Sequence, residues 1–497
     1  MPVVIAIDAG TTGVRALAID EAARTVGLAY REFTQYFPQP GWVEHDATEI
    51  ASVIREVLLE LTASLTEPVA TVGITNQRET VVAWSRSTSE PLHRAIVWQD
   101  RRTADRCERL VADGHLDLIR HKTGLVADPY FSASKLEWMF TEGGVERSDD
   151  LAVGTIDSWL LWNLTGGAVH ATDDTNASRT MLYDLASGDW SDELCNLFGV
   201  PRAALPEILA SSGRFGTVAP GWGLPEGTPI SGIAGDQQAS LFGQACFEPG
   251  MTKNTYGTGS FVLMNVGTER PDAVEGLITT TAWSLPDGAG GRRVTYALEG
   301  SIFVTGAGIQ WLRDGLGIID EAAEVGSLAE SVSDTDGVVV VPAFTGLGSP
   351  WWDPYARGTM LGITRGTTKA HLARAVLESI AYQTRDVVDA MTNASGTPLA
   401  ELRVDGGASA ADLLVRIQAD QLGVPVRRSR ERETTAQGAA FLAGLAEGFW
   451  ASLDDVAAAW ASDATFEADG DATVIEANYR RWLEAVERSR GWDRPIA

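Results

Sequence analysis

Cysteine is nearly absent from this sequence of 497 residues, which contains only three of them. Cys107, Cys195 and Cys246 are far apart, and none of them belongs to a Cys-x-x-Cys pair or to a cysteine–histidine pattern with metal-ligand spacing. A zinc site and a framework of disulfide bonds are therefore not expected. The pattern predicts three buried, reduced thiols, as in a cytosolic protein.

Positive charge is also in short supply. The chain has 39 Lys and Arg residues against 67 Asp and Glu residues, which gives a formal net charge of −28. Nucleic acids and anionic membranes both require a basic surface, so the composition argues against both partners. An anionic ligand would meet a repulsive overall field, and a site for it must supply local hydrogen-bond donors and a metal ion.

Long apolar runs are missing as well. No uninterrupted apolar stretch approaches the length of a membrane-spanning helix. The chain enters a predicted strand at Val3, without the charged segment and apolar core of a signal peptide. We therefore expect a cytoplasmic protein with no membrane insertion. A chain of this length exceeds one ordinary core and predicts at least two large domains.

The common phosphate-binding signatures do not occur, because the sequence has neither a GxxxxGK[ST] loop nor the HRD and DFG segments of protein kinases. Two Gly-Thr turns stand out instead. The first, residues 9–13, joins the predicted strands 3–8 and 14–19, and the second, residues 257–259, precedes the strand 261–265. One such hairpin in each half suggests two related domains that face a cleft.

The remaining pattern alternates strands with helices, which indicates α/β architecture. Asp46 and Glu49 have the spacing of a capping box, so we expect a helix that continues to about residue 61. Residues 402–405 are predicted as a strand that leads through the turn 406–409 into a helix over 410–421. Residues 288–293 are predicted as a hairpin loop and not as a phosphate site.

Arg78 and Glu79 stand side by side in a polar turn between two β-branched runs. Arginine only donates hydrogen bonds and an ionised glutamate only accepts them. Together they can hold two neighbouring hydroxyls of a small polyol. The alternative is a surface ion pair, worth about 0–1 kcal/mol.

Asp236 follows an apolar run directly, and Asp8 ends the first strand. Phosphoryl transfer to an alcohol requires positioning, a metal ion and a carboxylate near the attacking hydroxyl. We expect Asp236 to be that base and Asp8 to hold a hydrated Mg²⁺ next to the Gly-Thr turn. Asp236 can equally be the N-cap of a following helix, and the two roles are compatible.

Taken together, these segments closely resemble the FGGY carbohydrate-kinase family, over nearly the whole chain. The Asn-Gln-Arg-Glu-Thr and Trp-Gln-Asp-Arg-Arg segments are typical of its glycerol branch. The segments that carry the resemblance are residues 8–15, 76–80, 96–102, 128–132, 235–238, 254–259, 306–311 and 405–408, together with the two general family patterns at 130–138 and 358–378.

The resemblance implies a two-domain actin-like ATPase (ribonuclease H-like) fold, with domains 1–245 and 246–497, a hinge near residues 243–250 and an active site in the cleft between them. It implies that ATP and Mg²⁺ are used to phosphorylate glycerol to sn-glycerol 3-phosphate, and that the protein forms a dimer or tetramer. The implied glycerol contacts are Arg78, Glu79, Trp98, Tyr130, Asp236, Gln237 and Phe261. The implied nucleotide contacts are Thr11, Thr12, Gly13, Arg15, Thr258, Gly306, Gln310, Gly407 and the position of Ala411, and the implied metal-binding carboxylates are Asp8 and Asp236.

The sequence departs from the family pattern at three positions near the nucleotide. Ala9 replaces a usual Gln, Gly13 replaces a common Ser and so removes one hydroxyl, and Ala411 replaces an Asn that usually reaches the nucleotide. We therefore expect somewhat weak ATP binding. The region 213–230 lacks both the loop associated with fructose 1,6-bisphosphate inhibition and any histidine, so neither that inhibition nor activation by histidine phosphorylation is expected.

Two other functions remain open at this point. One is a kinase of the same family for another small polyol or sugar, against which the bulk of Trp98 beside Arg78 and Glu79 argues. The other is an actin-like ATP-binding switch that transfers no phosphate, which would leave Arg78, Glu79 and Asp236 without a task.

Overall fold

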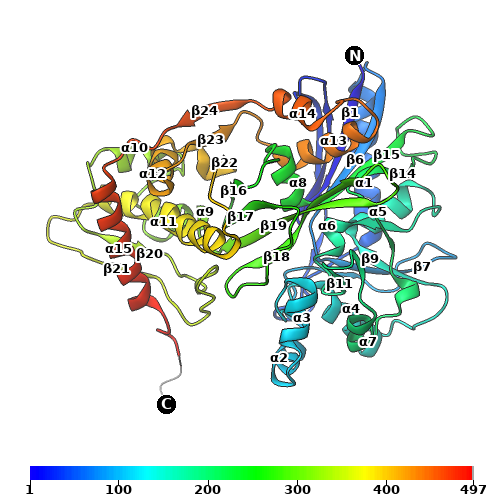
Figure 1. Ribbon diagram of the computed structural model, residues 1–497, viewed down its shortest axis with the longest axis horizontal. Helices are drawn as coiled ribbons and strands as arrows, with labels where there is room; N and C mark the ends of the chain where they lie inside the picture. Colours follow the sequence, from blue (N-terminus) through cyan, green and yellow to red (C-terminus); the bar gives the residue numbers. More distant parts are fainter. Residues whose placement is uncertain (495–497) are drawn as a thin grey trace.

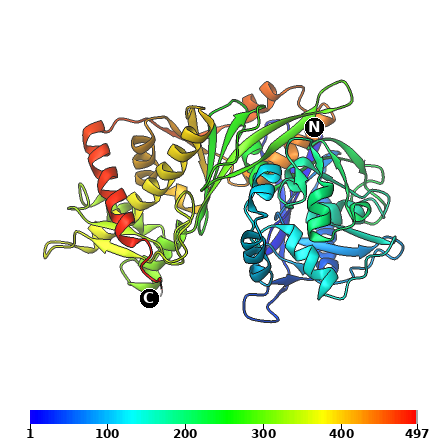
Figure 2. The same ribbon diagram turned by 60° about the horizontal axis from the view of Figure 1, so that its bottom comes forward.

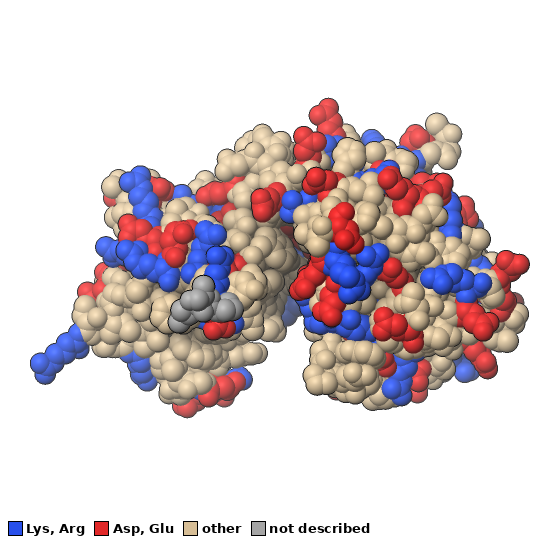
Figure 3. All heavy atoms as spheres, turned by 90° about the horizontal axis from the view of Figure 1, so that it is seen from below, with Lys and Arg blue, Asp and Glu red and all other residues tan. Residues whose placement is uncertain are grey.

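The computed structural model of the protein describes residues 1–494 and consists of two lobes, each built around a large mixed sheet. Figure 1 shows the N-terminal half, from blue to green, in one lobe and most of the yellow to red C-terminal half in the other. Figure 2 shows the two lobes from a second direction, and the space-filling view in Figure 3 shows the molecule hollowed between them. The α/β prediction is therefore confirmed, and the hollow lies where the two sheets approach each other.

The strands fall into two large sheets and four smaller ones. Those of the first lobe are β1 (Val3–Ala9), β2 (Gly13–Ile19), β3 (Thr25–Glu32), β4 (Gln35–Tyr36), β5 (Glu44–His45), β6 (Val69–Asn76), β7 (Val81–Ser85), β8 (Ala95–Ile96), β9 (Leu151–Thr155), β10 (Ala171–Asp173), β11 (Tyr183–Asp184), β12 (Asp189–Trp190), β13 (Glu207–Leu209), β14 (Ser212–Thr217) and β15 (Pro229–Gly235). Those that follow are β16 (Met251–Tyr256), β17 (Ser260–Gly267), β18 (Ile278–Pro286), β19 (Arg292–Ile302), β20 (Val339–Val341), β21 (Thr359–Leu361), β22 (Glu401–Asp405), β23 (Val426–Ser429) and β24 (Ser462–Phe466).

The helices cover the sheets from both sides. In chain order the α-helices are α1 (Ala47–Ser64), α2 (Ala104–Ala112), α3 (Leu116–Thr123), α4 (Ser132–Thr141), α5 (Ile156–Leu164), α6 (Asp174–Ala177), α7 (Asp192–Phe198), α8 (Asp236–Gly243), α9 (Gly306–Gln310), α10 (Glu324–Glu330), α11 (Lys369–Ser395), α12 (Asp412–Leu422), α13 (Thr434–Ala446), α14 (Leu453–Ala459) and α15 (Ala472–Ser489).

The two large sheets repeat one topology. The first has the order β14-β15-β6-β1-β2-β3 and the second has the order β18-β19-β17-β16-β22-β23-β24. In each, an antiparallel hairpin (β1–β2 or β16–β17) pairs its first strand in parallel with a strand that comes later in the chain (β6 or β22). The prediction that two equivalent hairpins open the two halves is confirmed by this register.

Strand β1 is buried along its whole length, as expected of a central strand with helices on both faces. Because side chains alternate along a strand, Ile5 and Ile7 pack with α1 and α5, whereas Val4 and Ala6 pack with α13. Helix α13 comes from residues 434–446, so a late part of the chain returns to cover the sheet of the first lobe. The core around α13 also contains residues of β17–β19, which couples the two lobes.

Several local predictions are corrected in detail. Asp46 caps α1 by accepting from the backbone N–H of Thr48 and Glu49, but the Glu49 side chain accepts from Thr34 and so does not complete a capping box. The predicted helix 410–421 begins later, at Asp412, because a 3₁₀ turn occupies residues 407–410. The N-cap of α8 is Gly235, and Asp236 is the first helical residue.

The three cysteines are buried and unbonded, as predicted. Burial raises the pKa of the Cys107 and Cys195 thiols to about 11, so both thiols are protonated at neutral pH. Within residues 1–494, none of the helices combines the length and the apolar character that crossing a membrane requires.

The contact between α8 and α13 depends on glycine. A Cβ atom at Gly438 would overlap the carbonyl oxygen of Ala239 in α8. We expect Gly438→Ala to lower the free energy of unfolding by ~1–3 kcal/mol, because the helices must move apart. Urea unfolding followed by circular dichroism measures this change.

Gly366 is the matched control, because it is exposed and the nearest atom to an added Cβ, Thr364 Oγ1, is 3.6 Å away. Gly366→Ala should leave the unfolding curve in place. An equal effect of the two substitutions would contradict the account of the α8–α13 contact.

Candidate active site at the junction of the two lobes

The turn between β6 and β7 places Arg78 and Glu79 inside the protein, where both side chains are almost fully buried. The interpretation of this pair as a surface ion pair is therefore wrong. Glu79 has a φ of 62°, which is uncommon for a residue with a side chain and persists only where the surroundings fix it. The local sequence supplies the turn, and the buried partners hold Glu79 in this conformation.

Arg78 is held by carboxylates from two directions. Its Nη1 and Nη2 donate to the two carboxylate oxygens of Glu299 at 2.6 and 3.2 Å, and its Nε lies 3.2 Å from Asp236 Oδ1. Glu299 belongs to β19 of the second sheet, so this bidentate pair joins the two lobes. A fork-shaped guanidinium bound in this way has a fixed orientation.

A second arginine completes the cluster. Arg179 donates from Nε to Glu79 Oε1 at 2.7 Å and from Nη2 to Glu299 Oε1 at 3.0 Å. Burial alone would raise the pKa of Glu299, but Arg179 and Arg78 hold it at about 2. Glu299 is therefore ionised at neutral pH, and the two arginines balance the charges of Glu299 and Glu79.

Aromatic rings border this cluster. The Tyr130 hydroxyl accepts from Arg78 Nη2 at 3.3 Å, and the Trp98 ring meets the Tyr130 ring edge-on at 5.5 Å between centroids. The half-buried Phe261 lies on the same face of the second sheet as Glu299, because Leu263, two residues along β17, pairs directly with Glu299. The predicted apolar walls thus belong to both lobes.

The first hairpin lies next to these rings. Trp98 Nε1 donates to Thr11 Oγ1 at 2.9 Å, and Arg15 Nε lies 3.6 Å from Asp8 Oδ2. Burial raises the pKa of Asp8 to about 7; Arg15 opposes this shift, and the nearby charges of Asp236 and Glu433 add to it. Asp8 and Asp236 therefore lie close enough to repel each other, and a cation between them would relieve that repulsion.

These carboxylates fit a magnesium ion. Mg²⁺ is usually held by one or two carboxylates, with water and substrate phosphates as its other ligands. Asp8 and Asp236 are such a pair, and among residues 1–494 they do not belong to a group of three or more metal-ligating side chains. The donor set suits a hard cation that arrives with a phosphate ligand.

The predicted nucleotide contacts of the second lobe gather around the turn between β16 and β17. The backbone N–H of Gly306 donates to the Gly257 carbonyl at 2.9 Å, which brings α9, with Gln310, against Thr258. A Cβ atom at Gly406 would overlap the backbone of Tyr256, so the β22–α12 turn also lies against this hairpin. Three of the predicted residues are exposed here: Thr258, Gln310 and Gly407.

Ala411 is the N-cap residue of α12 in this region. It is half-buried and lies close to Gly326, within 3.7 Å of a Cβ atom added there. Next to Gly407, by contrast, no atom lies within 4 Å of an added Cβ. The surface around the β22–α12 turn is therefore open to a ligand.

Several charged residues of the junction do not stand out in the sequence. Glu299 and Lys253 lie in the middle of strands, and Arg179 follows the short helix α6. No motif marks these three, and only burial and the pairing of distant strands show that they belong to the cluster. For Glu299 the one available signal is a charge that directly follows the apolar residues Ala297 and Leu298 within a strand.

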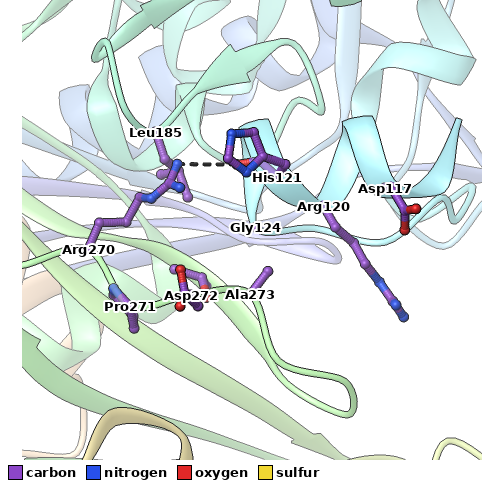
Figure 4. A pocket seen from close by; sticks show the side chains of 10 residues that line it. Asp117, Arg120, His121, Gly124, Leu185, Arg270, Pro271, Asp272 and Ala273 are labelled. Atoms are coloured by element: carbon purple, nitrogen blue, oxygen red, sulfur yellow. Dashed lines mark hydrogen bonds between the residues drawn. The ribbon is translucent and has the colours of Figure 1, made fainter.

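A separate cavity of about 320 Å³ opens between α3 and the loop after β17 (Figure 4). Arg270 reaches across it and donates to the carbonyl oxygen of His121 at 3.2 Å. None of the predicted site residues lines this cavity. It is a gap at the junction between the lobes, apart from the charged cluster.

Comparison with known proteins identifies the family. The model for the N-terminal domain of the FGGY family of carbohydrate kinases matches residues 3–243, and the model for its C-terminal domain matches residues 252–447. The chain belongs to the FGGY family of carbohydrate kinases, and the resemblance found in the sequence is confirmed. The fold is the two-domain actin-like architecture of that family, as predicted.

Individual relatives are more specific. Glycerol kinase of Bordetella parapertussis is 55% identical over 502 aligned residues, which cover 99% of this chain and 98% of the relative. Glycerol kinase of Deinococcus radiodurans is 52% identical, with 99% and 98% covered. A crystal structure of Plasmodium falciparum glycerol kinase with ADP matches with a TM-score of 0.94 at 36% identity and covers 98% of each chain.

A xylulose kinase structure from Lactobacillus acidophilus also matches, with a TM-score of 0.88 and 21% identity, and covers 97% of each chain. At this identity the likeness concerns the fold alone. Sugar kinases and glycerol kinases thus share this architecture, and the substrate must be argued from the site.

Breaking the buried arginine–carboxylate pairs should be strongly destabilising, because it leaves a buried charge without its partner. Glu299→Gln removes one charge from the cluster and leaves Arg78 and Arg179 partly unpaired, so we expect the free energy of unfolding to fall by about 3 kcal/mol. The pKa of Glu299 lies below its ordinary value of 4.5, so its contribution is complete above about pH 4.5 and is lost as the pH falls toward 2. Urea unfolding at pH 7 therefore measures the whole effect.

Glu330→Gln serves as the control. Glu330 pairs with Arg416 on the surface, where both side chains are about half exposed, and such pairs contribute ~0–1 kcal/mol. If the two variants lost the same stability, the cluster would not have the role described.

Proposed function

We propose that this protein transfers the γ-phosphoryl group of ATP to glycerol and forms sn-glycerol 3-phosphate. The observation that carries the proposal is the buried turn with Arg78 and Glu79. Arg78 Nε lies 3.2 Å from Asp236 Oδ1, and the rings of Trp98 and Tyr130 border the turn. Glycerol offers only hydroxyls and three carbons. A small pocket with fixed donors, fixed acceptors and aromatic walls suits such a substrate.

In this proposal Arg78 donates to one glycerol hydroxyl and Glu79 accepts from a second, while Tyr130, Gln237 and the walls of Trp98 and Phe261 complete the pocket. Sites built to bond hydroxyls reject analogues that lack them by ~10⁴-fold or more. The bulk of Trp98 beside Tyr130 leaves little room for larger sugars. This argues against a kinase for another polyol of the same fold.

Asp236 is proposed as the base. Its side chain is about one-third exposed at the start of α8, so it is accessible from the cleft while it contacts Arg78. It accepts the proton of the attacking hydroxyl as the hydroxyl oxygen bonds to the γ-phosphorus and the bond from that phosphorus to ADP breaks. Asp8 and Asp236 would hold Mg²⁺, which neutralises phosphate charge when bound.

ATP is proposed to span the two hairpins. Thr11, Thr12, Gly13 and Arg15 would contact its phosphates from the first lobe, and Thr258, Gly306, Gln310, Gly407 and Ala411 would border the nucleotide on the second. The domains are proposed as residues 1–245 and 246–497, and their closure would exclude water from the transfer.

We also propose that the protein is cytoplasmic and forms a homo-oligomer, either a dimer or a tetramer. Sedimentation of the purified protein would test its assembly.

The proposal predicts that ADP release with Mg-ATP is strongly stimulated by glycerol and much less by dihydroxyacetone, erythritol or xylulose. Asp236→Ala should lower the glycerol-dependent rate by ~10²-fold or more, because the base is lost. The control Asp272→Ala changes an exposed carboxylate at the separate cavity and should retain the rate.

Preference for a larger acceptor would keep the fold and reject the substrate. Slow ATP hydrolysis that ignores every acceptor would instead favour the actin-like switch.

Ala411→Asn should lower the KM for ATP by about two- to tenfold, because an amide at the start of α12 would add a hydrogen bond to the nucleotide. The KM for glycerol should stay the same. An unchanged or higher KM for ATP in this variant would contradict the proposed position of the nucleotide.

A further inference from the structure

Lys253 is an unusual buried cation. It lies on β16 with no exposed surface, and its Nζ donates to Gln237 Oε1 at 2.5 Å and to Thr255 Oγ1 at 3.1 Å. Among residues 1–494, no Asp or Glu side chain has an oxygen within 4.0 Å of Lys253 Nζ, so this lysine forms no ion pair there. Lysines are almost never fully buried unless they are paired, so the contact with the Gln237 amide calls for an explanation.

The strand register explains how this contact arises. Lys253 pairs with Leu263, and Leu263 pairs with Glu299, so Lys253 and Glu299 lie on the same face of the second sheet. That face is turned toward Arg78 and the start of α8. Gln237 is the second residue of α8, directly after Asp236. The Lys253–Gln237 contact therefore joins the two lobes beside the ion cluster.

The chemistry of the contact fixes the orientation of an amide. A lysine ammonium has three donors and no acceptor, so the atom of Gln237 that faces it must be the amide oxygen. The amide nitrogen, with its two hydrogens, is then turned away from Lys253. Without the ammonium this contact would no longer select one orientation, and Gln237 could present either a donor or an acceptor on its other side.

The surroundings keep Lys253 largely charged at neutral pH. Burial and, to a lesser extent, the positive charge of Arg78 lower its pKa to about 8. The negative charges of Asp405, Asp236 and Glu299 limit this decrease. A charged donor in a buried site makes a stronger hydrogen bond than a neutral one. The orientation of the Gln237 amide is thus well determined.

We propose that Lys253 is a positioning residue for the glycerol site, which fixes the Gln237 amide so that its Nε2 donates to a hydroxyl of the substrate. The inference rests on the proposed function and adds a residue to it. The amide nitrogen of Gln237 then faces the substrate as a hydrogen-bond donor, and Lys253 acts on glycerol only through that amide.

The test is a double-mutant cycle with Lys253→Met and Gln237→Leu, measured as ADP release with varied glycerol and varied Mg-ATP. Loss of one neutral hydrogen bond, from the Gln237 amide to a glycerol hydroxyl, predicts about a two- to tenfold increase in the KM for glycerol in each single variant. The double variant should be no worse than either single variant, because both remove the same interaction. The KM for ATP should change by less than about twofold in all three.

Two further variants separate this role from a structural one. Gln237→Glu keeps an acceptor for Lys253 but has no donor for the substrate, so its KM for glycerol should rise as in Gln237→Leu. Lys253→Arg keeps a charged donor and should stay closer to wild type than Lys253→Met does. Thr255→Val removes the second acceptor of Lys253, together with a 3.4 Å contact to Ser240 Oγ, but leaves the bond to Gln237 in place. It is the matched control and should have a KM for glycerol close to wild type.

The proposal would be overturned if the two fold increases in the KM for glycerol multiplied in the double variant. A parallel rise in the KM for ATP would also overturn it and would indicate that Lys253 acts on the phosphates. A Gln237→Glu variant with the wild-type KM for glycerol would also overturn it, and this variant decides the question if Lys253→Met does not fold. A wild-type protein that does not phosphorylate glycerol would instead refute the proposed function.

Discussion

The bidentate pair between Arg78 and Glu299 is the interaction on which the rest of the junction depends. Arg78 comes from the first sheet and Glu299 from the second, and both are almost fully buried. Removing either partner would leave an unpaired charge in an apolar environment, at a cost of several kcal/mol. Arg179 adds a further link from Glu299 to Glu79. The geometry of the proposed glycerol pocket is therefore set by the way the two lobes meet.

The two repeated sheets explain why a site forms at this place. In each lobe a hairpin and a neighbouring parallel strand end at the same edge, and the polar residues Asp8 and Asp405 stand at the ends of such strands. The lobes pack through a shared core of α8, α13 and strands β17–β19, which holds the two sheets against each other. The proposed phosphate side and the proposed acceptor side then adjoin through Trp98, which bonds to Thr11 and contacts Tyr130.

The parts of this arrangement that follow local rules were predictable from the sequence. The hairpins, the strand before Gly406 and the burial of the cysteines follow from apolar runs and turn residues, and the polar turn with Arg78 and Glu79 marks a candidate site. The partners Glu299, Arg179 and Lys253 were not predictable, because their role arises only from the pairing of strands far apart in the chain. The return of α13 to the first sheet is of the same kind, since an apolar helix buried on nearly all sides does not say which sheet it covers. The assignments of individual residues to glycerol, nucleotide and metal remain predictions.

The most direct test of the account is a crystal structure of the protein with glycerol, Mg²⁺ and a non-hydrolysable ATP analogue. The account predicts glycerol at the junction, with its hydroxyls bonded to Arg78, Glu79 and Asp236, and the analogue's phosphates beside the first hairpin with the metal between Asp8 and Asp236. Glycerol bound elsewhere, or an Arg78 whose bond to Glu299 is replaced by contact with phosphate, would contradict it.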